Sequence, residues 1–187
     1  MGFRRGFKTE ANNTALETRQ ELQLGPFDPL DPLVLAGYLE IPVLTLSDLA
    51  QDHSAIGYLL DGGSEVFSAA TVFYGTERTI VHNDAHSPGR QNSNLAHELA
   101  HGLLLHPPTP ALDDRGCREW NQSIEDEAGW LAGALLVPEA AAIAIARGKW
   151  TRDEAAAHFG VSNQMIQYRL NATGALLRVA RARASRR

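Results

Sequence analysis

The chain has a single cysteine, Cys117, and so lacks the partner that an internal disulfide needs. A chain with no disulfide is typical of a reducing compartment. It also lacks an apolar run of the ~20 residues that a membrane span requires, because glycine, proline or charge interrupts each hydrophobic stretch. The basic residues near the N-terminus are not followed by the apolar segment of a secretory signal. We therefore expect a soluble, cytoplasmic protein that does not enter a membrane.

Basic charge is scarce as well. The 17 lysines and arginines against 22 acids give a net charge of -5, which argues against a general nucleic-acid binder. The 44% hydrophobic and 21% charged residues are ordinary globular values, and 187 residues can form one domain with a core and a small appendage. Arginines gather in the last ten residues, 178–187, without an acid. We expect a solvated, disordered tail there, with weak attraction to DNA or an acidic partner as the alternative.

One short motif stands out against this background, His97-Glu98-Leu99-Ala100-His101. It is an H-E-x-x-H motif in a stretch with helical apolar spacing. Positions i and i+4 of a helix share a face, so both imidazoles can bind one ion. Glu98 points off that axis, where it can hold a water. The pattern predicts a zinc peptidase; two core histidines satisfied by hydrogen bonds are the alternative.

A catalytic zinc needs a third protein ligand and an open position for water. The segment 123–138 supplies three acids in the first turn of a predicted helix. Its inward stripe contains Ala128 and Ala132, and Glu125 lies on the same stripe. Glu127 projects about 160° away from Glu125 by helical rotation. The spacing therefore predicts Glu125 as the third ligand and Glu127 as a solvated acid near the helix N-terminus.

Peptide hydrolysis also needs a donor that stabilises the oxyanion. The sequence offers four candidates, for each of which an ordinary packing or surface role is the alternative: His82, His86, His106 and Tyr168. Cys117 lies between the two predicted ligand helices. Its thiolate could bind zinc as a redox switch, and a plain free thiol is the simpler interpretation.

Hydrophobic periodicity predicts an α+β fold. Helices over 8–22 and from Pro32, capped by Asp31, precede the sheet. Four short strands are expected, at 41–46, 56–60, 66–74 and 78–82. They should form a small, twisted, mostly antiparallel sheet packed on the zincin active-site helix, 93–106, which Asn92 or Ser93 would cap. The second ligand helix should cover 124–136, capped by Ser123, and a short helix 138–147.

The C-terminal part should be helical. A capping box, Thr151 with Glu154, starts one helix that ends at Gly160, and Ser162 caps a last helix that reaches about Leu177. We therefore expect a zincin-like metallopeptidase domain over 1–147, a helix-turn-helix-like region over 148–177 and the tail over 178–187.

Two segments together carry a resemblance to a known family. The stretch 97–106, H-E-L-A-H-G-L-L-L-H, and the stretch 125–138, which begins E-D-E-A, resemble the signatures H-E-L-G-H-x-L-L-H and E-x-E-A-N-x-F-A-x-x-L-L-M-P of the ImmA/IrrE metallopeptidases. This gluzincin-like resemblance extends over roughly 5–175. It implies that His97, His101 and Glu125 bind zinc, with manganese as the alternative metal, and that Glu98 is the catalytic carboxylate.

The chain departs from the family pattern at three positions. Ala100 stands where glycine is usual, and Leu131 replaces phenylalanine. Gly129 replaces the asparagine or aspartate that would orient a ligand histidine one turn beyond Glu125. In this family the expected activity is limited proteolysis of a partner, typically an Xre-type helix-turn-helix repressor in a stress-response or mobile-element circuit.

The competing hypothesis is a DNA- or protein-binding regulator with a degenerate peptidase site. The helical pair over 151–160 and 162–170 is similar to a DNA-reading pair. Its second helix offers four side chains for base contacts, Asn163, Gln164, Gln167 and Arg169. A helical hairpin packed on the peptidase core for substrate docking is the alternative.

Overall fold

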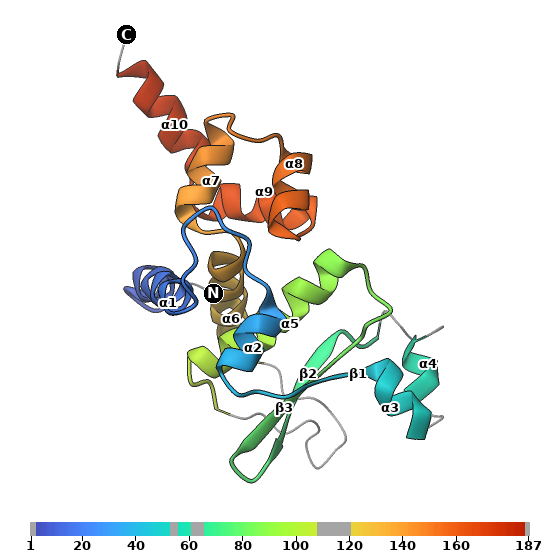
Figure 1. The fold of residues 1–187 in the computed structure, drawn as a ribbon. Helices are drawn as coiled ribbons and strands as arrows, with labels where there is room; N and C mark the ends of the chain where they lie inside the picture. The colour runs from blue at the N-terminus through green and yellow to red at the C-terminus, as the bar shows by residue number, and fades with distance from the viewer. Residues whose placement is uncertain (1–2, 53–55, 61–65, 108–120, 186–187) are drawn as a thin grey trace.

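The computed structural model describes residues 3–52, 56–60, 66–107 and 121–185 (Figure 1). In these residues three strands form one sheet in the order β1-β3-β2. β1 (Val43–Thr45) runs parallel to β3 (Glu77–His82), and β2 (Ala69–Tyr74) runs antiparallel to it. Helix α5 (Pro88–Leu103) packs against β2 and β3. The α+β prediction is confirmed, with a mixed sheet whose longer pair is antiparallel.

The register of the hairpin decides which side chains face α5. Thr71 of β2 pairs with Ile80 of β3, and cross-strand partners lie on the same face of a sheet. Ile80 is buried in the core, so the Thr71 side chain also faces inward. Gly75, with φ of 61°, forms the turn between the two strands.

One predicted strand is wrong. Residues 56–60 were expected to be extended, and the structure has a short helix there, α4 (Gly57–Leu60). A second short helix, α3 (Leu46–Asp52), follows β1 directly. Periodicity over so few apolar residues does not separate helix from strand, so the surroundings decide.

The core forms around α6 (Gln122–Leu136), which packs against both α5 and α1 (Phe7–Glu21). Leu131, Leu135 and Leu136 of α6 are fully buried. Two buried arginines satisfy carbonyls at the C-terminal end of α6, where the helix leaves acceptors without a partner. Arg19 Nη1 donates to the Leu135 carbonyl at 2.7 Å, and Arg169 Nε donates to the Val137 carbonyl at 2.9 Å.

No single helix in the described part of the chain is long and apolar enough to span a bilayer; α6 and the next helix, α7 (Glu139–Ala146), meet that test only together, across a 66° bend.

One predicted cap is confirmed before the sheet, and the starts of α5 and α6 differ from the prediction. Asp31 caps α2 (Pro32–Tyr38), accepting a hydrogen bond from the Leu33 amide at 2.8 Å. α5 begins at Pro88, earlier than the predicted 93, because proline is pre-organised for the first helical position. Asn121, not Ser123, caps α6, since its side chain accepts from the amide of Ser123 at 3.1 Å.

The C-terminal helices gather at one end of the molecule (Figure 1). The predicted capping box is present at the start of α8 (Arg152–Phe159), and Ser162 caps α9 (Asn163–Ala172). The last helix does not run unbroken to 177. Gly174, with φ of 62°, interrupts it, and α10 (Ala175–Ala184) follows.

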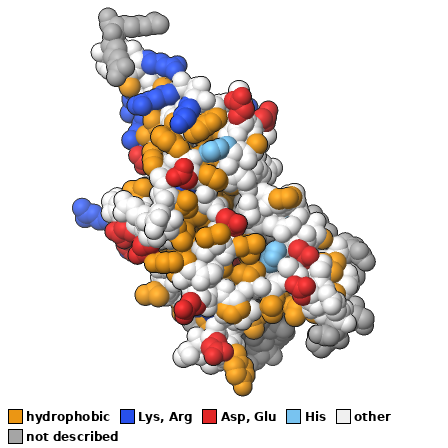
Figure 2. Space-filling view, viewed as in Figure 1, with side chains coloured by type: hydrophobic (Ala, Val, Ile, Leu, Met, Phe, Trp, Pro, Cys, Tyr) orange, Lys and Arg blue, Asp and Glu red, His pale blue; other side chains and the backbone are white. Residues whose placement is uncertain are grey.

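The expected disorder of the tail is wrong as far as Ala184. Ala175 and Val179 of α10 are buried, and α10 packs on α7. Arg178 Nη1 also lies 2.6 Å from Glu139 Oε1 of α7. Figure 2 shows lysine and arginine side chains gathered where α10 leaves the body of the molecule.

The turn between α8 and α9 packs against the first residues of α5. Asn92 Nδ2 donates to the Gly160 carbonyl at 2.9 Å. A Cβ added at Gly89 would lie 3.0 Å from the Val161 carbonyl carbon and 3.1 Å from the Ser162 nitrogen. The hairpin therefore rests on the motif helix.

This contact predicts opposite effects for two Gly→Ala substitutions. Gly89→Ala should destabilise the protein by about 1–3 kcal/mol, because the new methyl meets backbone that cannot rotate away. Gly129→Ala, in a helix with no atom within 4 Å of the new Cβ, should stabilise by up to about 1 kcal/mol. Urea unfolding measures both, and a Gly89→Ala midpoint at or above wild type would contradict the close contact.

Candidate metal centre

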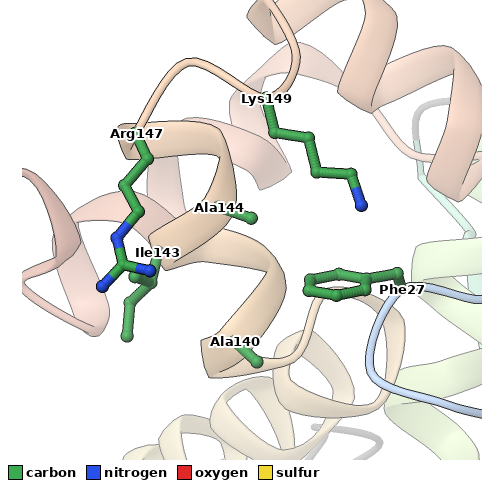
Figure 3. A pocket seen from close by; sticks show the side chains of 6 residues that line it. All are labelled: Phe27, Ala140, Ile143, Ala144, Arg147 and Lys149. Carbon is green, nitrogen blue, oxygen red and sulfur yellow. The ribbon is translucent and has the colours of Figure 1, made fainter.

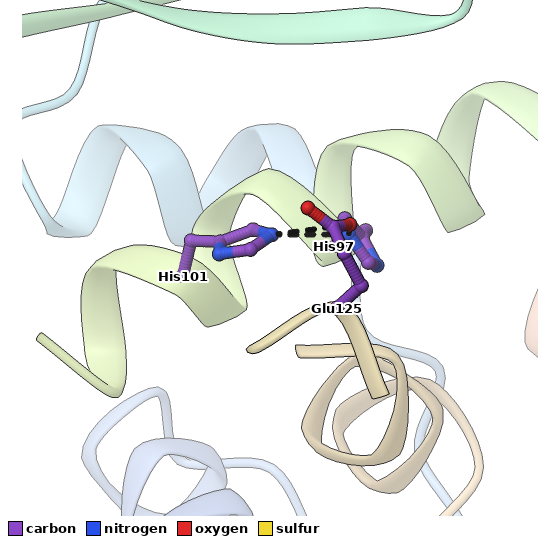
Figure 4. Close-up of side chains that lie close together, drawn as sticks. All are labelled: His97, His101 and Glu125. Carbon is purple, nitrogen blue, oxygen red and sulfur yellow. Dashed lines mark hydrogen bonds and ion pairs between the residues drawn. The ribbon is translucent and has the colours of Figure 1, made fainter. Parts of the chain in front are cut away.

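Three side chains converge where α5 packs on α6. His97 and His101 lie one turn apart on α5, and Glu125 comes from the first turn of α6 (Figure 4). His97 Nε2 lies 3.0 Å from Glu125 Oε2 and 3.1 Å from His101 Nε2. His101 Nε2 lies 3.8 Å from the same Glu125 oxygen. One ligand atom from each residue lies within 4.8 Å of the others.

Local structure explains this convergence. The i, i+4 spacing puts both imidazoles on one face of α5, while Leu95 and Leu99 fill the opposite face and are buried. Glu125 is at the N-terminal end of α6, where the helix dipole favours a negative charge. Packing of α5 on α6 then brings the carboxylate to the two rings.

The donor set fits a zinc ion. Two ligand atoms of a tetrahedral zinc at 2.0–2.1 Å lie about 3.3 Å apart, and the three separations here bracket that value. The side chains are 28%, 21% and 18% exposed, so water can reach the centre. Two imidazoles, one carboxylate and an accessible side form a candidate catalytic metal site. The three predicted ligands are brought together, and their role stays a prediction.

Glu98 has a partner that the sequence did not indicate. Thr71 Oγ1 of β2 donates to Glu98 Oε2 at 2.7 Å, in a part-buried position. Strand alternation predicts that Thr71 shares a face with Ala69 and Phe73, but only the packing of the sheet on α5 shows which face meets Glu98. The hydroxyl holds the carboxylate in a fixed orientation beside the predicted ligands.

His106 is the oxyanion candidate that the structure brings to the three ligands, and it contacts the opposite side of a ligand ring. Its Nδ1 lies 2.9 Å from His101 Nδ1, whereas His101 Nε2 faces His97. His106 Nε2 lies 3.4 Å from Glu127 Oε2. The expectation of a solvated Glu127 is therefore wrong, because its side chain is only 16% exposed and meets His106.

The other three candidates lie elsewhere in the fold. His82 ends β3 and is buried, and burial and the neighbouring His86 lower the pKa of its imidazole. His86 is in the loop before α5, with its Nδ1 3.4 Å from Asn94 Nδ2. The Tyr168 ring packs over Gly133 of α6, and burial raises the pKa of its hydroxyl. Cys117 lies outside the described residues.

The side chains proposed to read DNA are largely engaged within the protein. Asn163 Nδ2 donates to Asp153 at 2.6 Å, and Gln167 Oε1 accepts from Arg152 at 2.9 Å. Arg169 is fully buried, and burial lowers the pKa of its guanidinium to about 10. Gln164 is exposed. Arg169 is thus part of the core, which the sequence pattern alone did not reveal.

A separate hollow of about 470 Å³ opens between α7 and the loop that follows α1 (Figure 3). Lys149 Nζ lies 4.0 Å from the centre of the Phe27 ring, and this stacked pair forms one wall. Six residues line the hollow: Phe27, Ala140, Ile143, Ala144, Arg147 and Lys149. None of them is part of the candidate metal centre.

Comparison with known families gives one match. The profile of the IrrE N-terminal-like domain, Peptidase_M78, matches residues 39–171, more than two thirds of the chain. The match includes α5, α6 and all three predicted ligands. No curated protein matches the chain significantly.

The buried His82 predicts a specific pH dependence of stability. Its pKa is lower in the folded protein than the ~6.5 of an unfolded chain, so unfolding takes up a proton. The contribution of neutral His82 is complete above about pH 6.5 and decreases as the pH falls below it. Replacing His82 with Gln should therefore flatten the loss of stability between about pH 7 and 5, measured by urea unfolding. Parallel curves for the two proteins would contradict this, since the remaining histidines are common to both.

Proposed function

The chain belongs to the IrrE N-terminal-like family of peptidases, and from this premise we propose that it is a zinc-dependent endopeptidase performing limited proteolysis of a partner protein. The observation that carries the proposal is the convergence of His97, His101 and Glu125. Glu98, which follows the first histidine directly, supplies the base that hydrolysis needs.

In this proposal the two histidines and Glu125 hold the ion. Zinc is favoured over manganese because imidazole suits zinc, whereas manganese prefers oxygen ligands. When bound, zinc supplies a Lewis acid that polarises the scissile carbonyl and makes water a nucleophile near neutral pH. The protein contributes a fixed donor set whose side chains are partly exposed to water.

Glu98 moves the proton in this scheme. Its carboxylate accepts a proton from the attacking water as the new C–O bond forms at the scissile carbonyl. It then delivers the proton to the amine nitrogen as the C–N bond breaks, so the base is regenerated. The Thr71 hydroxyl occupies one lone pair of Oε2 and leaves the rest of the carboxylate for this exchange.

We further propose an Xre-type helix-turn-helix repressor as the substrate, cut in a stress-response or mobile-element circuit in the cytoplasm. The two signature-like segments over 97–106 and 125–138 support this choice. The single cysteine and the acidic net charge are in keeping with it.

For the α8–α9 hairpin we favour substrate docking over DNA reading. Its turn is packed on α5, and the buried Arg169 donates to the Val137 carbonyl at the C-cap of α6. A DNA-binding role would show as a steep decrease of affinity with salt, because phosphate contacts release counterions. A docking role would show as a loss of substrate affinity when the hairpin is altered, without any salt-dependent affinity for DNA.

The central test is Glu98→Gln. This variant keeps the shape of the side chain and removes the base, so cleavage should decrease by about 10²–10⁴-fold while zinc content stays at the wild-type level. Fragments of an Xre-type repressor encoded beside the gene, identified by mass spectrometry, measure cleavage. The matched control is Glu139→Gln on α7, which should cleave normally. Undiminished cleavage by Glu98→Gln would remove it from the mechanism.

The Thr71 contact makes a second prediction. Thr71→Val keeps the side-chain volume but removes the hydroxyl that Glu98 accepts, so kcat should decrease about tenfold, as for loss of one hydrogen bond to a charged group. Thr71→Ser should keep most of the activity, and zinc affinity should not change in either variant. Equal rates for the valine and serine variants would contradict the role of the hydroxyl.

A further inference from the structure

We propose that His106 and Glu127 are positioning residues for the metal ligand His101, and that Arg4 holds Glu127 in place. This inference rests on the proposed metal centre and adds a second layer of residues to it. Three segments supply that layer: the N-terminal turn, the turn that follows α5 and the second turn of α6.

The hydrogen-bond chain has one consistent direction. His101 turns Nε2 toward the other ligands, so a metal-binding ring must carry its proton on Nδ1. The atom 2.9 Å from that nitrogen is His106 Nδ1, which must then accept. His106 therefore carries its own proton on Nε2, the atom 3.4 Å from the Glu127 carboxylate. Each N–H in this series of hydrogen bonds, from His101 through His106 to Glu127, has an acceptor. The series therefore favours the His101 tautomer whose Nε2 has a lone pair for a metal.

Backbone geometry brings His106 back over His101. Leu105, just beyond the end of α5, has a φ of 53°, in the left-handed region that costs energy for a residue with a branched side chain. Leu105 is 83% exposed, so packing of its side chain does not explain the conformation. The turn lets the His106 amide donate to the His101 carbonyl at 3.0 Å, with the two ring centres 5.0 Å apart.

The hydrogen-bonded residues closest to His101 are the most buried. The His106 side chain is 8% exposed and that of Glu127 is 16% exposed, so water competes little for their hydrogen bond. Arg4 is 53% exposed. Its Nε lies 3.5 Å from Glu127 Oε1, while its other nitrogens bind both oxygens of Glu10. Arg4 thus ties the N-terminal turn to the carboxylate that orients His106.

The test is zinc affinity, measured by competition with a chromophoric chelator on the full chain. His106→Phe and Glu127→Ala should each weaken zinc binding about 10–100-fold, because His101 loses its fixed orientation. His106→Gln, whose amide oxygen can accept from His101 Nδ1, should restore most of the affinity. Arg4→Gln should weaken binding by at most about fivefold, as expected for an exposed ion pair.

The matched control is Asp126→Asn. Asp126 lies between Glu125 and Glu127 in the same turn and accepts from Gln122 at 2.7 Å. This variant should bind zinc as the wild type does. The double variant His106→Phe/Glu127→Ala should bind zinc no more weakly than the weaker-binding single variant, because both residues act through the same series of hydrogen bonds to His101.

A second readout separates positioning from folding. The visible spectrum of the cobalt-substituted protein should change in His106→Phe, and urea unfolding of the metal-free protein should show that the variant is folded. The inference is overturned if His106→Phe and His106→Gln bind zinc equally, or if Asp126→Asn weakens binding as much as Glu127→Ala. Failure of the wild-type chain to bind zinc would instead overturn the proposed function.

Discussion

The packing of α5 on α6 is the contact on which the rest of this structure depends. It brings a carboxylate from one helix to two imidazoles on the other, and the same contact contains the fully buried leucines of the core. Stability and the candidate chemistry therefore share one interface. A change that shifts α6 by an ångström would move Glu125 away from the histidines and would also open the core.

Each end of this helix pair is fixed by residues from outside it. At the C-terminal end of α6, Arg19 and Arg169 satisfy backbone carbonyls. At the N-terminal end, Glu127 meets His106 and Arg4. The N-terminus of α5 rests on the α8–α9 turn. The helical hairpin and the N-terminal turn thus belong to the framework of the candidate metal centre.

The candidate site contains two layers of polar residues. The inner layer, the three predicted ligands, follows from helical spacing. The outer layer comes from elements that only the fold brings near: a strand for Glu98 and a turn for His101. An outer layer of this kind fixes tautomers and ring orientations. This chain has such an outer layer although Gly129, one turn beyond Glu125, has no side chain that could orient a histidine.

The sequence by itself determined whatever depends on local periodicity: the α+β class, the caps at Asp31 and Thr151, and the face that His97 shares with His101. It also predicted Glu125 on the face that the structure turns toward the two histidines, because that residue lies on the apolar stripe of its helix; its role as a ligand stays a prediction. Only the tertiary structure decided the helix at 57–60, the burial of Arg169 and the partners of Glu98 and Glu127. Those outcomes depend on contacts between residues distant in the chain, and no pattern within a single segment carries that information.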